Sequence, residues 1–177
     1  MEHNLDNFNE IVMLGDSIIE WFLGSEYKNL GHVGYTTRDL TWYLEDHSKI
    51  SGKLGILLIG VNDILSNFKK EISEKYYTET IKILQERFDK ILIIKLLPTD
   101  MITINKKIIL FNSFIDISYK MVKNIFILDI YNNFLNYKNQ EKNIANKYTT
   151  DGIHLSNMGY ELFKKLLEEK VNNILRI

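Results

Sequence analysis

Four short apolar runs, separated by longer stretches with helical periodicity, constrain the fold of this chain more than any other feature. Each run is bounded by turn residues, as buried strands of a parallel sheet are. The runs are Ile11–Leu14, Leu54–Ile59, Ile91–Leu97 and Ile125–Ile130, with a weaker fifth at Tyr27–Leu30. Apolar strands that alternate with helices predict a parallel sheet with helices on both of its faces.

The stretches between the runs carry apolar residues at helical spacing. Helices are predicted at Thr36–Asp46, Lys69–Phe88 and Ile104–Val122, and Ser156 is placed as the N-cap of a last helix. The stretch from Asn132 to Lys147 is polar and weakly periodic, which predicts a loop with a short helix. Because there is no internal repeat and no linker, we expect one domain over residues 1–177.

Composition excludes several classes of protein. The net charge of −1 provides no electrostatic footprint for nucleic acid, and the absence of cysteine excludes disulfides and thiolate chemistry. The four histidines show no metal-ligand spacing, so neither a metal nor a cofactor is expected. Met1–Glu10 is too polar for a secretory signal, and no apolar run approaches the roughly 20 residues of a membrane span. We therefore expect a cytoplasmic protein without a membrane span.

The first apolar run ends in Gly15-Asp16-Ser17, which places a serine where a strand meets a helix. Serine in this position is often only a helix cap. The carboxyl ends of strands are also where open α/β sheets bind ligands. A serine hydroxyl is a weak nucleophile until a base accepts its proton, so a catalytic interpretation of Ser17 requires a partner.

Four histidines are candidates for that base: His3, His32, His47 and His154. Asp151 and His154 stand three residues apart in a turn that contains glycine, so carboxylate and imidazole can lie side by side. The carboxylate would then hold the tautomer of the ring. An Asx turn beside a surface histidine explains the same pattern without catalysis.

Two further segments follow strands and carry groups that donate hydrogen bonds. Asn62 comes directly after the run Leu54–Ile59, and its amide can donate to a developing oxyanion, although turn asparagines are common. Gly31 and Gly34 follow the weak run at Tyr27–Leu30, where backbone N–H groups can approach a ligand without a Cβ in the way. Either glycine could instead serve only the geometry of a turn.

Taken together, these segments resemble the four blocks of the SGNH, or GDSL-type, family of esterases and acylhydrolases. The resemblance covers essentially the whole chain, in the family's order: Gly15-Asp16-Ser17, Gly34, Gly60-x-Asn62-Asp63 and Asp151-x-x-His154. The run from Asn29 to Thr37 looks most like the branch of platelet-activating-factor acetylhydrolases. The resemblance implies a flavodoxin-like, three-layer α/β/α sandwich with a five-stranded parallel sheet.

The family resemblance also implies roles for individual residues. Ser17 would be the nucleophile, His154 the base and Asp151 the acid that orients it. The oxyanion hole would consist of the N–H groups of Ser17 and Gly34 and the side chain of Asn62. No cofactor is implied.

One position departs from the family pattern. Many members have an acidic residue after the glycine of the second block, where this chain has Tyr35. Gly31 therefore competes with Gly34 as the oxyanion donor, and the substrate rim is expected to be more aromatic. Trp21 either shares that rim with Tyr35 or belongs to the core.

The resemblance implies a carboxylic ester hydrolase acting on a small-molecule ester. Because no long apolar lid is present, we expect a small acyl group such as acetyl, with a carbohydrate as one class of leaving alcohol. A lysophospholipase or thioesterase is the alternative on the same site, and the enzyme would be a monomer or a homodimer.

Two functions of other classes were weighed against the esterase. A phospho-acceptor signalling domain would use Asp16, Asp63 and Lys95, but it leaves Asn62 and His154 without a role. A binding module without activity is disfavoured because every catalytic position is filled.

Overall fold

The structure is a computed structural model in which residues 10–136 and 143–177 are described. Its centre is a sheet of five parallel strands in the order β2-β1-β3-β4-β5. The strands are β1 Ile11–Gly15, β2 Lys28–Gly31, β3 Gly52–Leu58, β4 Phe88–Ile94 and β5 Ile125–Leu128. This order is the flavodoxin-like one, so the predicted fold is confirmed.

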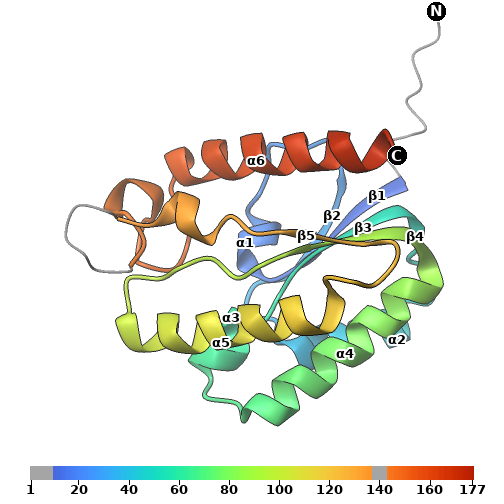
Figure 1. The fold of residues 1–177 in the computed structure, drawn as a ribbon, viewed down its shortest axis with the longest axis horizontal. Helices are drawn as coiled ribbons and strands as arrows, with labels where there is room; N and C mark the ends of the chain where they lie inside the picture. The colour runs from blue at the N-terminus through green and yellow to red at the C-terminus, as the bar shows by residue number, and fades with distance from the viewer. Residues whose placement is uncertain (1–9, 137–142) are drawn as a thin grey trace, which may run out of the picture.

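Helices cover both faces of the sheet. The α-helices are α1 Ser17–Glu20, α2 Thr37–Asp46, α3 Val61–Leu65, α4 Lys70–Arg87, α5 Ile102–Tyr119 and α6 Asn157–Leu175. Two short 3₁₀ helices are η2 Tyr131–Phe134 and η3 Asn146–Tyr148. Figure 1 shows α6 with α1 on one side of the sheet and α2, α3, α4 and α5 on the other.

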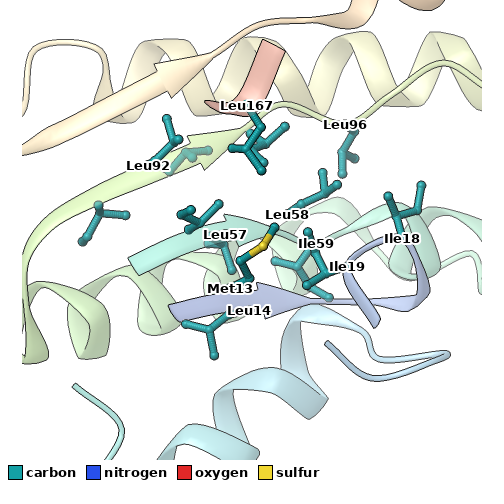
Figure 2. Close-up of a cluster of buried hydrophobic side chains, with 14 of the residues drawn as sticks. Met13, Leu14, Ile18, Ile19, Leu57, Leu58, Ile59, Leu92, Leu96 and Leu167 are labelled. Atoms are coloured by element: carbon teal, nitrogen blue, oxygen red, sulfur yellow. The ribbon is translucent and has the colours of Figure 1, made fainter. Parts of the chain in front are cut away.

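The central strands are buried on both faces, which is why their sequences are apolar without alternation. All five residues of β1 are buried, as are the last five of β3 and the last four of β4. Figure 2 shows side chains of β1, β3 and β4 packed with Ile18, Ile19 and Leu167 from helices α1 and α6. Fully burying one such aliphatic side chain stabilises the fold by about 1.5–3 kcal/mol.

The sheet also determines where a site can form. The chain leaves β1 for β2 on one side and later returns to β3 on the other, and β1 pairs with both strands. Such a switch point opens a crevice at the carboxyl ends of the strands. The residues that follow β1, β2 and β3 therefore converge at one edge.

Two predicted runs are longer than the strands they contain. Leu96 and Leu97 lie beyond the end of β4, and Ile130 lies beyond β5, yet all three are buried. They are apolar because the loops they belong to pack over the end of the sheet. In the predicted loop from Asn132 to Lys147 the structure has parts of η2 and η3, and residues 137–142 lie outside the described residues.

None of the helices in the described part of the chain combines the length and the apolar character that crossing a bilayer requires.

Candidate active site

Ser17 is the first residue of α1 and stands directly after β1. The cap of this helix is Asp16, whose Oδ1 accepts a hydrogen bond from the N–H of Ile18 at 3.0 Å. The predicted alternative of Ser17 as the cap is therefore wrong, since its neighbour performs that role. The Ser17 hydroxyl does not cap the helix, and its Oγ lies 3.0 Å from Nε2 of His154.

Asp151 holds the other side of the His154 ring. Its Oδ2 lies 2.6 Å from Nδ1 of His154, and its Oδ1 accepts the backbone N–H groups of Ile153 and His154 at 3.0 and 2.7 Å. Because the carboxylate faces Nδ1, the ring proton belongs there and Nε2 is free to accept the proton of Ser17. Partial burial alone would raise the pKa of Asp151, but the hydrogen bonds from His154 and Ile153 lower it to about 2. The carboxylate is therefore ionised at neutral pH.

Trp21 covers the His154 ring. The two ring centroids are 4.3 Å apart and the planes are tilted by 35°, while 44% of Trp21 remains exposed. The predicted alternative of a core position is therefore wrong, and the place of Trp21 on the substrate rim stays a prediction.

Asn62 follows β3 and begins the short helix α3 with Val61. Its Nδ2 donates one hydrogen bond to the backbone oxygen of Tyr35 at 2.9 Å. A primary amide has two N–H donors, so this bond orients the group and leaves the second donor for a ligand.

The two glycines after β2 differ in the state of their N–H groups. The Gly31 N–H donates to Oδ1 of Asn29 at 2.9 Å, so it is already used. Gly34 is exposed and has a φ of +78°. Its N–H donates to no residue within 10–136 and 143–177, and the same holds for the N–H of Ser17. The geometry favours Gly34 over Gly31 as an oxyanion donor.

A buried carboxylate ties together the two loops that carry these donors. Asp63 accepts the N–H of Thr37 at 2.8 Å through Oδ2 and the Thr37 hydroxyl at 2.6 Å through Oδ1. Asp63 adjoins Asn62, and Thr37 is the first residue of α2, three residues beyond Gly34. Burial raises the pKa of Asp63, and the hydrogen bonds from Thr37 act against that rise. The sequence pattern placed Asp63 in the third block without indicating this role, because the partner Thr37 is distant along the chain.

The loop that carries Gly34 is also fastened to α1. The Glu20 carboxylate accepts the N–H of Val33, and Asn29 Nδ2 donates to the backbone oxygens of Ile19 and Phe22 at 2.6 and 3.2 Å. From the other side, the Tyr160 hydroxyl of α6 donates to the oxygen of Ile18 at 3.0 Å.

The remaining histidines do not join this group. His32 stacks on Tyr35 at a centroid distance of 4.5 Å, and Nδ1 of His47 lies 2.8 Å from the backbone oxygen of Tyr43. His3 lies outside the described residues. Tyr35 directly follows Gly34, and its place on the substrate rim stays a prediction.

The phospho-acceptor alternative required Lys95 beside Asp16 and Asp63. The Lys95 ammonium instead bonds Asp116 and, at 2.8 Å, Asp129. The acidic cluster with lysine that this alternative needs is therefore not formed by these residues.

Asp16 has a second oxygen that no group in the described structure satisfies. The side chain is 1% exposed and borders a small cavity of about 10 Å³ that also touches Ile18, Val61 and Ile153. Burial raises the pKa of Asp16 to about 7, against the opposing effects of the Ile18 N–H and of His154. The cavity touches the neighbours of Ser17, Asn62 and His154.

No group of three or more histidine, cysteine or acidic side chains arranged to hold a metal occurs among the described residues. What the arrangement contains is a serine, an imidazole and a carboxylate in hydrogen-bonding sequence, with N–H donors beside the serine. This set can carry out acyl transfer.

The family model for GDSL-like lipases and acylhydrolases matches residues 13–167. The chain belongs to the GDSL-like lipase/acylhydrolase family. Members of this family are esterases and acylhydrolases, and the chain is accordingly a carboxylic ester hydrolase. The predicted family is confirmed.

Solved structures share the fold of this GDSL-like hydrolase. A GDSL-like lipase from Bacteroides thetaiotaomicron has a TM-score of 0.83 at 18% identity, covering 98% of this chain and 92% of that chain. A carbohydrate esterase of family 3 from Talaromyces cellulolyticus has a TM-score of 0.63 at 14% identity, with coverages of 96% and 99%. An acetyl esterase mutant with an acetate ion has a TM-score of 0.68 at 12% identity, with coverages of 95% and 98%. At these identities the likeness concerns the fold alone. No curated protein was found to match the chain.

Proposed function

We propose that this GDSL-like hydrolase removes a small acyl group, such as acetyl, from an ester through an acyl-serine intermediate on Ser17. The observation that carries the proposal is the continuous relay from Ser17 Oγ to His154 Nε2 and from His154 Nδ1 to Asp151, at 3.0 and 2.6 Å.

In the first step, Ser17 Oγ attacks the carbonyl carbon of the ester while its proton passes to Nε2 of His154. The negative charge that develops on the carbonyl oxygen is held by the N–H groups of Ser17 and Gly34 and by the amide of Asn62. The bond to the alcohol then breaks, and the alcohol leaves with the proton from His154. Asp151 stabilises the imidazolium that exists between these two proton transfers.

In the second step, water attacks the acyl-serine. His154 accepts the proton of the water, and a second tetrahedral species forms in the same oxyanion hole. Its collapse releases the carboxylic acid and returns the proton to Ser17 Oγ, which restores the enzyme.

One feature supports a small acyl group. The larger apolar groove of about 200 Å³ lies between α3, α4 and α5, and none of Ser17, Asn62 and His154 lines it, so it is not placed to hold a long acyl chain bound at Ser17. The similarity of the fold to an acetyl esterase and a carbohydrate esterase makes acetylated sugars the first substrates to screen.

The Ser17→Ala variant tests the nucleophile. We expect kcat for p-nitrophenyl acetate to fall by about 10⁴-fold or more, because no other hydroxyl faces His154 Nε2 in the described structure. Ser48→Ala, at an exposed serine away from the site, is the matched control and should keep full activity. Undiminished turnover in Ser17→Ala would refute the assignment.

A series of p-nitrophenyl esters of increasing acyl length tests the substrate class. We expect kcat/KM to be highest for acetate and to fall as the acyl chain lengthens. A preference for chains of about eight carbons or more would contradict the small-acyl proposal and favour the lysophospholipase or thioesterase alternative.

A further inference from the structure

The outermost strand β5 leaves one edge of the sheet open. Its sequence, Ile-Phe-Ile-Leu, contains neither a charge nor a proline, the usual protections of an exposed edge. The oxygens of Asn124 and Leu128 accept N–H groups from the β4 side, at 2.9 and 3.0 Å. Since backbone groups alternate sides along a strand, the N–H and C=O of Ile127 face away from β4. Ile127 is therefore available to pair with another strand.

A groove of about 480 Å³ runs along this edge, with α5 on one side and α6 on the other. Figure 1 shows β5 between these two helices. Its lining includes Asp116 and Lys120 of the α5 side, Asp129 after β5 and Lys170 of α6. An extended segment can therefore reach the open backbone of β5.

Charge along the edge is divided between the two ends of β5. Near its carboxyl end, Asp116 and Asp129 share the single ammonium of Lys95, so this end carries a net negative charge. Lys123 lies two residues before β5, and Lys120 is one helical turn beyond Asp116 toward the start of β5. The two ends of the edge therefore carry opposite charges.

The same side of the molecule exposes large apolar side chains. Ile117 and Met121 adjoin Asp116 and Lys120 in the sequence, and they are 87% and 93% exposed. Exposed large apolar side chains that lie together mark an interaction site in soluble proteins.

We propose that the β5 edge, together with α5, is the interface of a homodimer in which β5 of one copy pairs antiparallel with β5 of a second copy. A two-fold axis across the edge sets the acidic end of one strand opposite the basic end of the other, so the charges that would repel in a parallel arrangement attract. The pairing occupies Ile127 on both copies, joins the two sheets into one of ten strands, and brings Ile117 and Met121 near the contact. A strand of another protein would satisfy the backbone equally well, but the division of charge fits a second copy of this chain.

The mass of the protein in solution tests the proposal. We expect the wild type to sediment as a dimer, at twice 20.9 kDa, at concentrations near 0.1 mM, where interfaces of ordinary size form. Ile127→Pro removes an N–H that faces away from β4, so the ladder within the monomer is kept while the pairing between copies is lost. This variant should be monomeric and should retain wild-type turnover of p-nitrophenyl acetate. A wild type that is monomeric at all concentrations would overturn the proposal.

Charge reversal provides a second variant that does not depend on proline. Lys120→Glu combined with Lys123→Glu places acid opposite acid across the two-fold axis. We expect the dissociation constant of the dimer to rise by about tenfold or more, most clearly at low salt. Lys106→Glu combined with Lys107→Glu, an equal change of charge on exposed residues near the start of α5, is the control and should leave the dimer intact. A dimer that survives both Ile127→Pro and the double reversal uses another surface, and the proposal would then be wrong.

Discussion

At the scale of single residues, Asp16 and Ser17 have different roles at the end of β1. Asp16 caps α1 by accepting the N–H of Ile18, which leaves both the hydroxyl and the N–H of Ser17 free of local partners. If Ser17 were the cap, its hydroxyl would be used by the helix and unavailable to His154. The capping carboxylate therefore leaves the Ser17 hydroxyl available for the nucleophilic role that we propose.

Asn62→Ala tests the oxyanion hole at the residue scale. The side chain donates one N–H to Tyr35 and presents the other, so its loss removes a donor that matters most in the transition state. We expect kcat for p-nitrophenyl acetate to fall by about 10²–10³-fold with little change in KM. Asn172→Ala, at an exposed asparagine of α6, should behave as wild type. A raised KM with an unchanged kcat would remove Asn62 from the oxyanion hole.

Asp16→Asn tests the state of the buried carboxyl. Since burial raises its pKa from 3.8 to about 7, the folded chain keeps a proton there that the unfolded chain releases between about pH 4 and 7. The free energy of unfolding therefore falls as the pH rises through this window, by about 4 kcal/mol for this group, and levels off above it.

Asparagine preserves the cap oxygen and cannot titrate. Urea unfolding at about pH 4 and about pH 8 should therefore show that Asp16→Asn gains stability relative to the wild type as the pH rises. The groups that face Asp16, which are Asp63, His154 and Tyr160, are present in both proteins, so only their coupling to Asp16 differs between the two. Parallel pH dependence in the two proteins would show that Asp16 is already ionised below neutral pH.

At the scale of elements, short helices and loops at the carboxyl edge of the sheet are cross-linked by side chains. α2 and α3 are joined through Asp63 and Thr37, and the loop before α2 is joined to α1 through Glu20 and Asn29. The proposed oxyanion donors Ser17, Gly34 and Asn62 come from three different segments, so their separation depends on these links. The bonds of Asp63 are buried, that of Asn29 is partly buried and that of Glu20 is exposed, and a single substitution can remove each link.

Thr37→Val tests the link between α2 and α3. Valine keeps the shape and the backbone N–H but deprives the buried Asp63 of a hydroxyl donor, which should cost about 1–3 kcal/mol of stability. We expect kcat to fall about tenfold because Asn62 and Gly34 are no longer held in register, and Thr37→Ser should restore it.

Thr36→Val provides the control on the same helix. It removes the capping box with Asp39, at a cost of about 1 kcal/mol, without touching Asp63. Its stability should fall while kcat is retained. An equal loss of kcat in both variants would mean that any weakening of α2, and not the bond to Asp63, disturbs the site.

At the scale of the whole molecule, the site closes when the end of the chain returns to its beginning. Ser17 and His154 are 137 positions apart. The loop before α6 is fastened to the loop between β4 and α5 by the Asp100 N–H, which donates to the Gly152 oxygen at 2.8 Å. Ser156 then caps α6 by accepting the N–H of Gly159. Packing of α6 thus places His154 and Asp151, the proposed base and its acid, beside Ser17.

Gly152→Ala tests this closure. Gly152 has a φ of +89°, and a Cβ there would lie 2.2 Å from the Asp100 carboxyl, so the loop must shift. The strained backbone alone should cost about 1–3 kcal/mol, and kcat should drop because Asp151 and His154 flank the glycine. Gly24→Ala, where the nearest atom to a new Cβ is Lys164 Cδ at 3.6 Å, is the matched control. Full activity in Gly152→Ala would show that the loop tolerates the shift without moving His154.

Much of this architecture could be predicted from local patterns. The apolar runs marked four strands because buried parallel strands are apolar, and a weaker run marked the partly buried edge strand β2. Ser156 marked the start of α6 because an N-cap has a local signature. The ends of the runs were less reliable: Leu96, Leu97 and Ile130 are buried in loops, and burial alone does not distinguish a strand from a buried loop.

Other features had no local signature. Asp16 and Ser17 are both good caps, and only the position of His154 shows which of them is free. The competition between Gly31 and Gly34 was decided by Asn29, whose side chain takes the Gly31 N–H. Asp63 and Lys95 looked alike as polar residues near strand ends, yet one holds Thr37 and the other pairs with Asp116 and Asp129.

The sequence by itself determined the class of fold, the family and the set of residues from which the site is built, because these depend on periodicity and on residue types at fixed spacing. Only the tertiary structure decided which atoms meet: Ser17 Oγ with His154 Nε2, the Asn62 amide with Tyr35, and Asp63 with Thr37. The physical reason is that a hydrogen bond depends on distances of tenths of an ångström between groups far apart in the chain, and those distances follow from the packing of the sheet and its helices.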